Sequence, residues 1–252
     1  MKTLALALTV LLTSQAHAIL NIESLRLKMR NEPAGALLSV SYDRKEGNTD
    51  TNRFKGAGQG ITRAGEFEHL ATLEREFGTT AGVHDTDRAL VHARTNWLYK
   101  NPLSYEAYAQ LEEDQFRRLS MRGLVGAGLR QRIADEKEFM LFTGVGAFWS
   151  RETLEHAPDT TDAGTTDISR ANVYFSVNYL IVPEIELNGI VYYQPAVRSI
   201  ADYRVLNTTQ TVMRVNERLS VSFNYTLAYD SLPPEKVQRA DQSYSTALNF
   251  RF

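Results

Sequence analysis

Histidine and carboxylate side chains are the residues of this sequence best suited to catalysis or metal binding. The histidines after residue 18 are His69, His84, His92 and His156. No two of them have the spacing of a metal-binding pair. His84 adjoins Asp85 and Asp87, as in barrel proteases, but no second acidic cluster could hold an activated water. His69 would suit a lipase at a membrane surface, yet its neighbours on the same predicted face are mostly apolar. We therefore predict no catalytic residue, no metal site and no cofactor.

A second acidic group, formed by Asp159, Asp162 and Asp167, belongs to a threonine-rich segment. Calcium loops need closely spaced oxygen ligands and a sharp glycine turn, which Gly164 supplies only roughly. We expect a solvated loop at this place.

Three glycine-rich motifs, which begin at Gly56, Gly126 and Gly144, superficially resemble phosphate-binding loops. Such a loop needs a following helix whose N-terminus meets the anion, and no helix is predicted there. We expect these glycines to relieve crowding and to allow bends in a curved sheet.

Charged residues that alternate with apolar ones along predicted strands carry whatever function the protein has. The apolar positions mark one face of each strand, so the charges lie on the other face. The inward charges are expected to be Glu68, Glu74, Arg94, Glu106, Glu112, Arg122, Arg130 and Glu186. Glu106 and Glu112 share one strand. Across a hairpin they should face Arg122 and Arg130. Two interpretations stay open, namely a salt-bridge network that fills the interior and a lining for a small permeation path.

Twelve segments with this two-residue alternation must position the charges. They are 36–45, 52–63, 66–77, 87–100, 103–114, 120–133, 139–153, 167–181, 185–195, 202–215, 219–229 and 243–252. Single-chain bacterial barrels have an even number of strands. The predicted fold class is therefore all-β, an antiparallel transmembrane β-barrel of about 12 strands.

Short and long connections alternate along the chain, as do the periplasmic turns and outer loops of such barrels. The short connections are 64–65, 101–102, 134–137, 182–184 and 216–218. The long ones are 46–51, 78–86, 115–119, 154–166, 196–201 and 231–240. This alternation of short and long connections places the C-terminus on the periplasmic side.

Aromatic residues near the ends of predicted strands should form girdles at the two lipid interfaces. They are Tyr42, Trp97, Tyr99, Tyr105, Trp149, Tyr179 and Tyr229. The last strand has an apolar face that we predict to be the membrane-insertion signal. This face carries Tyr244, Leu248, Phe250 and Phe252. The expected partners are outer-membrane lipid and, during assembly, the machinery that inserts barrels.

The start of the chain is predicted to be a secretory signal peptide. Lys2 precedes a short apolar stretch, and Ala16-His17-Ala18 gives a cleavage pattern. We therefore predict a signal peptide at 1–18, a periplasmic lead-in at 19–35 and the barrel at 36–252. The chain has no Cys and a net charge of −2, so we expect no disulfide and no nucleic-acid partner.

Four segments resemble a family of salt-induced outer-membrane proteins. These are residues 21–26, residues 47–51, the Gly126-Ala127-Gly128-Leu129 motif and the ending from Tyr229 to Phe252. The resemblance spans nearly the whole chain after residue 18 and implies a bacterial outer-membrane barrel. It carries over no functional residue.

The leading interpretation is a narrow pore or an envelope-integrity barrel, related to stress, with a charged and partly occluded lumen. One alternative is a barrel enzyme, either a lipase or a protease. The other is a soluble periplasmic β-protein that binds an apolar ligand, which would need its apolar residues turned inward.

Deletion of Phe252 tests the insertion signal. If this residue completes the signal, the truncated chain should accumulate unfolded in the periplasm, as cell fractionation with a heat-modifiability gel would show. Normal outer-membrane levels of the truncated chain would contradict the prediction.

Overall fold

The computed structural model describes residues 26, 32–45, 51–216 and 219–250. Within them the chain is almost entirely β-strand, with one short 3₁₀ helix, η1 (Gln115–Arg117). No helix among these residues is long and apolar enough to cross a membrane. The predicted signal peptide, and Phe252 of the predicted insertion signal, lie outside the described residues.

Twelve antiparallel strands form one sheet in which each strand pairs with the next along the chain. The strands are β1 (Ala34–Lys45), β2 (Thr51–Ala64), β3 (Phe67–Thr80), β4 (Val83–Trp97), β5 (Leu103–Asp114), β6 (Leu119–Asp135), β7 (Phe139–Leu154), β8 (Gly164–Val182), β9 (Ile185–Ala196), β10 (Ser199–Arg214), β11 (Leu219–Asp230) and β12 (Ala240–Phe250). The predicted all-β barrel of about twelve strands is confirmed.

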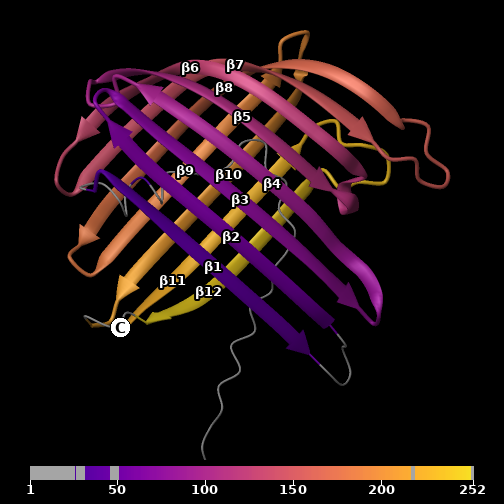
Figure 1. Cartoon of the computed structure of the whole chain (residues 1–252), viewed down its shortest axis with the longest axis horizontal. Coiled ribbons are helices and arrows are strands. Elements are labelled where there is room, and N and C mark those ends of the chain that lie inside the picture. The colour runs from indigo at the N-terminus through magenta and orange to yellow at the C-terminus, as the bar shows by residue number, and fades with distance from the viewer. Residues whose placement is uncertain (1–25, 27–31, 46–50, 217–218, 251–252) are drawn as a thin grey trace, which may run out of the picture.

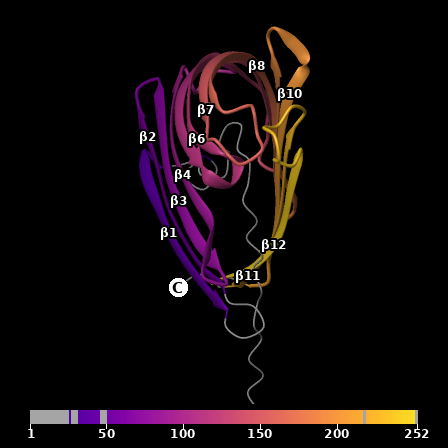
Figure 2. The ribbon, with the colours of Figure 1, turned by 90° about the vertical axis from the view of Figure 1, so that its right-hand side faces the viewer.

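The sheet curls around an interior, with β1–β4 on one side and β10–β12 on the other (Figures 1 and 2). Within the described residues no backbone pairing joins β1 to β12, so a seam separates the first and last strands. The short connections that follow β2, β4, β6, β8 and β10 share one end of the barrel, which we call the turn end. The other connections share the opposite end, which we call the loop end.

Two connections that were predicted to be long are tight turns, so these predictions are wrong. β3 and β4 remain paired as far as Thr80 and Val83, which leaves only Ala81 and Gly82 between them. Both turn residues have positive φ, 51° and 76°, as two-residue hairpin turns require. β9 and β10 are likewise separated by residues 197–198 alone.

The two faces of the sheet differ in the way that the alternation predicts. Large apolar side chains such as Leu73 and Phe175, each 59% exposed, cover the outside. Polar side chains such as His92 and Gln194, each 0% exposed, point into the interior. Most large apolar side chains of the described strands thus face outward, opposite to what a soluble protein with an apolar ligand cavity requires.

A cluster of aromatic residues crosses the middle of the interior. We call it the aromatic layer, and it consists of Tyr108 on β5, Phe148 on β7, Tyr174 on β8 and Tyr192 on β9. These four side chains are 0–5% exposed. The rings of Tyr174 and Tyr192 have their centroids 5.3 Å apart.

Glycines of β6 and β7 make room for this layer. A Cβ atom on Gly126 would lie 2.6 Å from the ring of Tyr108. A Cβ atom on Gly144 would overlap with the ring of Tyr174. The predicted role of these glycines, relief of crowding in a curved sheet, is confirmed at these positions.

Substitution Gly144→Ala should therefore force Tyr174 out of its position. Overpacking of this kind typically costs about 1–3 kcal/mol, and we expect a loss in this range in denaturant unfolding from lipid vesicles. Gly56→Ala is the matched control, because its Cβ would lie 3.7 Å from the nearest atom. Equal stability of the two variants would contradict the packing argument.

Candidate functional site

The interior of the barrel is the candidate site, and it has three parts along the barrel axis. A charged network, which we call the loop-end belt, lies near the loop end. The aromatic layer lies in the middle. A pocket, which we call the turn-end pocket, opens near the turn end.

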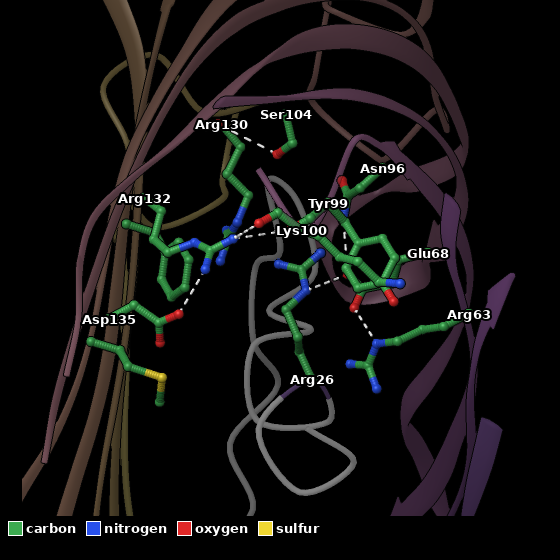
Figure 3. A pocket seen from close by; sticks show the side chains of 12 residues that line it. Arg26, Arg63, Glu68, Asn96, Tyr99, Lys100, Ser104, Arg130, Arg132 and Asp135 are labelled. Carbon is green, nitrogen blue, oxygen red and sulfur yellow. Dashed lines mark hydrogen bonds and ion pairs between the residues drawn. The ribbon is translucent and has the colours of Figure 1, made fainter. Parts of the chain in front are cut away.

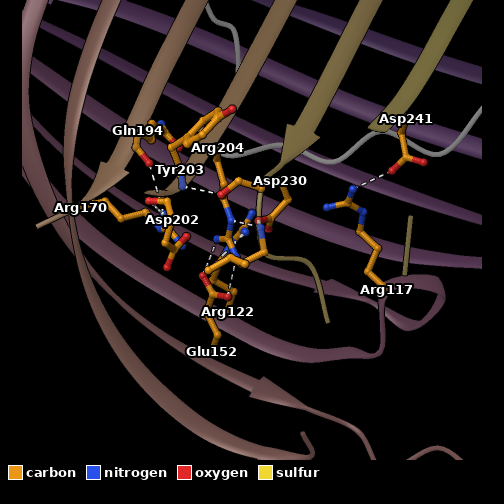
Figure 4. Close-up of polar contacts among 12 residues, drawn as sticks. Arg117, Arg122, Glu152, Arg170, Gln194, Asp202, Tyr203, Arg204, Asp230 and Asp241 are labelled. Carbon is orange, nitrogen blue, oxygen red and sulfur yellow. Dashed lines mark hydrogen bonds and ion pairs between the residues drawn. The ribbon is translucent and has the colours of Figure 1, made fainter. Parts of the chain in front are cut away.

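Arg204 of β10 is the centre of the loop-end belt (Figure 4). Its guanidinium donates to both carboxylate oxygens of Glu152 on β7, at 2.6 and 2.9 Å, and to Asp230 at 2.8 Å. Two strands separate β7 from β10 in the sheet. The Arg204–Glu152 pair therefore spans the interior and ties distant walls together.

Neighbouring charges extend the belt around the wall. Arg122 on β6 forms an ion pair with Glu112 on β5, as predicted for this hairpin. On the other side, Arg170 on β8 donates to Asp202 on β10 at 2.8 Å. The belt thus combines acidic and basic side chains that burial alone would penalise.

A second network lies between the belt and the turn-end pocket. Arg94 pairs with Glu106 at 3.1 Å, and both side chains are almost fully buried. The Tyr174 hydroxyl donates to Glu106 at 2.6 Å and accepts from Arg130 at 3.2 Å. Glu106 and Arg130, which were predicted to face each other, are thus connected through a tyrosine hydroxyl. The alternation of residues in the sequence does not reveal this connection.

The turn-end pocket has a volume of about 250 Å³ (Figure 3). Glu68 is its central carboxylate. Arg26 and Arg63 donate to Glu68 at 2.7 and 2.9 Å, and Asn96 donates at 3.0 Å. Arg26 belongs to the predicted lead-in, so this segment reaches the interior of the barrel at this point.

Six of the eight predicted inward charges are buried in the interior. They are Glu68, Arg94, Glu106, Glu112, Arg122 and Arg130. Glu74 lies on the inward side of β3 and is half-buried. Glu186 lies near the turn end, where its half-exposed side chain is 3.6 Å from Arg214.

Sequence reasoning did not identify the main residues of the belt, namely Glu152, Arg170, Arg204 and Asp230. Asp230 comes one residue after the predicted end of its strand. Glu152 lies on a strand with the glycine pair Gly144 and Gly146, where alternation between apolar and polar residues is weak. The available signal was a spacing of two residues between polar side chains, which joins Arg170 to Asn172 on β8 and Asp202 to Arg204 on β10.

The histidines do not assemble a catalytic group. His92 is buried, and its Nδ1 lies 3.1 Å from Gln110 Oε1. His69 faces outward, and its Nδ1 lies 3.0 Å from Thr95 Oγ1. Within the described residues, no carboxylate is hydrogen-bonded to His69. His84 lies on β4, contrary to its predicted place in a loop, because the β3–β4 pairing extends past it.

The acidic residues of the threonine-rich segment take part in contacts between loops. Asp162 pairs with Arg118 at 2.7 Å and accepts from the backbone amide of Glu235. The amide of Glu235, together with Arg118, lowers the pKa of Asp162 below its ordinary value. Asp167 instead forms a two-point pair with Arg151. In the described part of the chain no three potential ligands gather around a metal position.

Four of the predicted girdle residues are exposed on the outer face: Trp97, Tyr105, Trp149 and Tyr179. Tyr99 is an exception, and its prediction is wrong, because it lies in the β4–β5 turn and lines the turn-end pocket. Of the predicted insertion signal, Tyr244 is 68% exposed. Leu248 and Phe250 lie on β12, but their side chains are outside the described part.

Comparisons with known proteins give a family match and distant structural similarities. Residues 38–252 match a family described as "Protein of unknown function, DUF481". No curated protein matches the sequence significantly. A solved structure of the NanC porin is 9% identical with a TM-score of 0.48, over 87% of this chain and 98% of that one. A porin refined at 1.8 Å resolution is 10% identical with a TM-score of 0.36, over 77% and 62%.

The Arg94–Glu106 pair provides a measurement of how dry the interior is. Arg94→Gln leaves the Glu106 carboxylate buried without its cation, which typically costs about 3–5 kcal/mol. Neutralising Glu106 as well, in the double variant Arg94→Gln/Glu106→Gln, should recover much of this loss. Denaturant unfolding in lipid vesicles measures both.

The control is Arg151→Gln, which breaks the exposed Arg151–Asp167 pair and should leave the stability close to that of the wild type, because solvent screens this pair. If Arg94→Gln loses as little stability as the control, water screens the interior charges and the interior is open.

Proposed function

The chain belongs to DUF481, a family of unknown function. We propose that it is an outer-membrane β-barrel that acts as a narrow pore with a partly occluded lumen. Apolar side chains over the outer face support the membrane location. An exposed apolar surface of this extent is unfavourable in water, whereas lipid accommodates it. The strands have 11 to 19 residues, enough for tilted strands to cross a bilayer.

The proposal orients the barrel by its connections. Short turns lie on the periplasmic side of such barrels, so the turn end, where β12 ends, faces the periplasm. Outer-membrane lipid and the insertion machinery are the partners that this location requires. The proposal includes no enzymatic activity, cofactor or nucleic acid.

Closure of the barrel is part of the proposal. Unpaired backbone groups at an open sheet edge are costly in hydrocarbon, so the edges of β1 and β12 must pair in a membrane. These two strands run in opposite directions, as antiparallel pairing requires.

The aromatic layer is the observation that carries the proposed narrow pore. Polar and charged side chains line the interior on both sides of this layer, at the loop-end belt and at the turn-end pocket. Movement of a few rings would join the two polar regions into one path, whereas their present packing limits conduction.

Planar-bilayer recording of the refolded chain tests this proposal. The wild type should show small and infrequent conductance steps. The double variant Phe148→Ala/Tyr192→Ala removes two rings of the layer and should raise the unitary conductance several-fold, because it opens a continuous path.

Phe175→Ala is the matched control, since it removes an outward ring of β8 that is 59% exposed, and its conductance should equal that of the wild type. All variants are first checked for the heat-modifiable folded band. A wild type that conducts like an open porin, or a folded double variant that conducts no better than the wild type, would contradict the proposal.

A further inference from the structure

Three connections meet at the loop end of the barrel. They are the connection between β5 and β6, which contains η1 and Arg118, the β7–β8 loop (155–163) and the β11–β12 loop (231–239). Figure 2 views the barrel from the loop end, where the β7–β8 loop crosses in front of the interior towards the β11–β12 loop. We call the three connections together the loop-end latch.

Arg118 is the centre of the latch. Its guanidinium pairs with Asp162 of the β7–β8 loop at 2.7 Å. The same guanidinium donates to the backbone carbonyl of Glu155 at 2.9 Å and to that of Glu235, in the β11–β12 loop, at 2.9 Å. Arg118 is only 8% exposed. One buried guanidinium therefore joins all three connections.

The two long loops also bind each other directly. The carboxylate of Glu235 accepts from the backbone amide and the hydroxyl of Thr161, at 3.0 and 2.8 Å. The backbone amide of Glu235 donates to Asp162 at 2.7 Å. Beside them, the Lys236 ammonium donates to the carbonyl of Pro158 at 2.5 Å. The loops are thus held together at several points through backbone and side-chain groups.

The contacts of the latch cross the mouth of the barrel. Arg117 of η1 donates to Asp241 on β12 at 2.6 Å (Figure 4). η1 leads into β6, and β12 lies six strands beyond β6 in the sheet order. Six strands are half of a twelve-stranded barrel, so this contact links opposite walls. The latch therefore narrows the loop-end mouth next to the loop-end belt.

The base of the β11–β12 loop is anchored separately from its tip. Ser231 is 8% exposed, and its hydroxyl donates to the carbonyl of Ala201 at 2.9 Å. The same hydroxyl accepts from the amide of Tyr203 at 2.7 Å. These contacts tie the base to β10 without the help of Arg118. Loss of the latch contacts would therefore free the tip of the loop while its base stays in place.

Backbone strain in the latch favours release. Arg118 has a φ of 57°, and Lys236 has a φ of 65°. Residues with a side chain adopt this conformation at a cost, and they keep it only where surrounding contacts hold them. Because opening would relieve the strain at both residues, the strain offsets part of the stabilisation that the contacts provide. The closed latch thus depends on all of its contacts together.

We propose that the loop-end latch is a lid with two states. In the closed state Arg118 holds the β7–β8 and β11–β12 loops together and the mouth is narrow. In the open state these contacts are lost, the two loops separate and the strands stay in place. This inference goes beyond the proposed pore, because it concerns the position of two loops and requires no passage through the aromatic layer.

Pulsed electron paramagnetic resonance on the refolded full chain in lipid vesicles tests the inference. The chain has no Cys, so Ala163→Cys and Gln238→Cys introduce the only two thiols for nitroxide labels. Both side chains are exposed, and there is one on each loop. A closed latch should give a single short and narrow distance between the two labels.

Two variants should open the latch in this labelled chain. Arg118→Gln should raise the ratio of open to closed latch by about tenfold, the effect of one hydrogen bond to a charged group. The distance distribution should then become longer and broader. Glu235→Ala removes only the contacts to Thr161, so it should cause a smaller increase of the same kind. Because Glu235 is exposed, this second variant should keep the heat-modifiable folded band.

Arg198→Gln is the matched control. It removes the same charge from the exposed β9–β10 turn, which lies at the same end of the barrel but outside the latch. The distance between the labels should equal that in the labelled chain without further substitution.

Three results would overturn the inference. A broad distribution in the labelled chain without further substitution would show that the loops do not hold each other. An unchanged distance in folded Arg118→Gln, or in Glu235→Ala, would show that these contacts do not keep the latch closed. An equal change in Arg198→Gln would show that net charge, rather than the latch, sets the distance. Conductance is not measured here, so failure of the pore proposal leaves these results unchanged.

Discussion

The alternation of side chains along each strand is the constraint on which the rest of this molecule depends. Because one face of every strand carries apolar residues outward, the polar residues of the same strand must enter the interior. Charges that are buried there are tolerated only with partners. The closest partners often lie on another wall, as with Arg204 and Glu152. The interior is consequently cross-linked by ion pairs, and its polarity follows from the apolar outer face.

The same constraint explains why aromatic rings and glycines occur together in the middle of the barrel. Tyr174 must reach Glu106, which lies three strands away, so its ring extends across the interior surface of β7. Only a residue without a side chain at position 144 leaves space for that ring. Buried ion pairs of this kind contribute little net stability, because their desolvation offsets much of their attraction. The burial of the rings supplies the favourable term.

The fold could be predicted from the sequence because period-two alternation is local information. It identified all twelve strands, and register within a hairpin was enough to pair Glu112 with Arg122. Contacts across the interior depend instead on the tilt and register accumulated over several strands, so Arg204–Glu152 could not be foreseen. Tyr99 was misplaced for a related reason, since a turn residue does not follow the alternation of the strand before it. Glycine and aspartate near residues 78–87 suggested a long loop, but pairing across the hairpin continued past them.

Arg130 connects the turn-end pocket to the aromatic layer. It lines the turn-end pocket, and its guanidinium donates to the hydroxyl of Tyr174 in the aromatic layer. The same hydroxyl donates to Glu106, so the ring of Tyr174 is positioned by an acid on one side and a cation on the other. A shift of the Arg130 guanidinium would therefore change both the wall of the pocket and the hydrogen bonding of the ring. The shape of the pocket and the packing of the aromatic layer are thus coupled through one guanidinium, and the coupling acts equally in both directions.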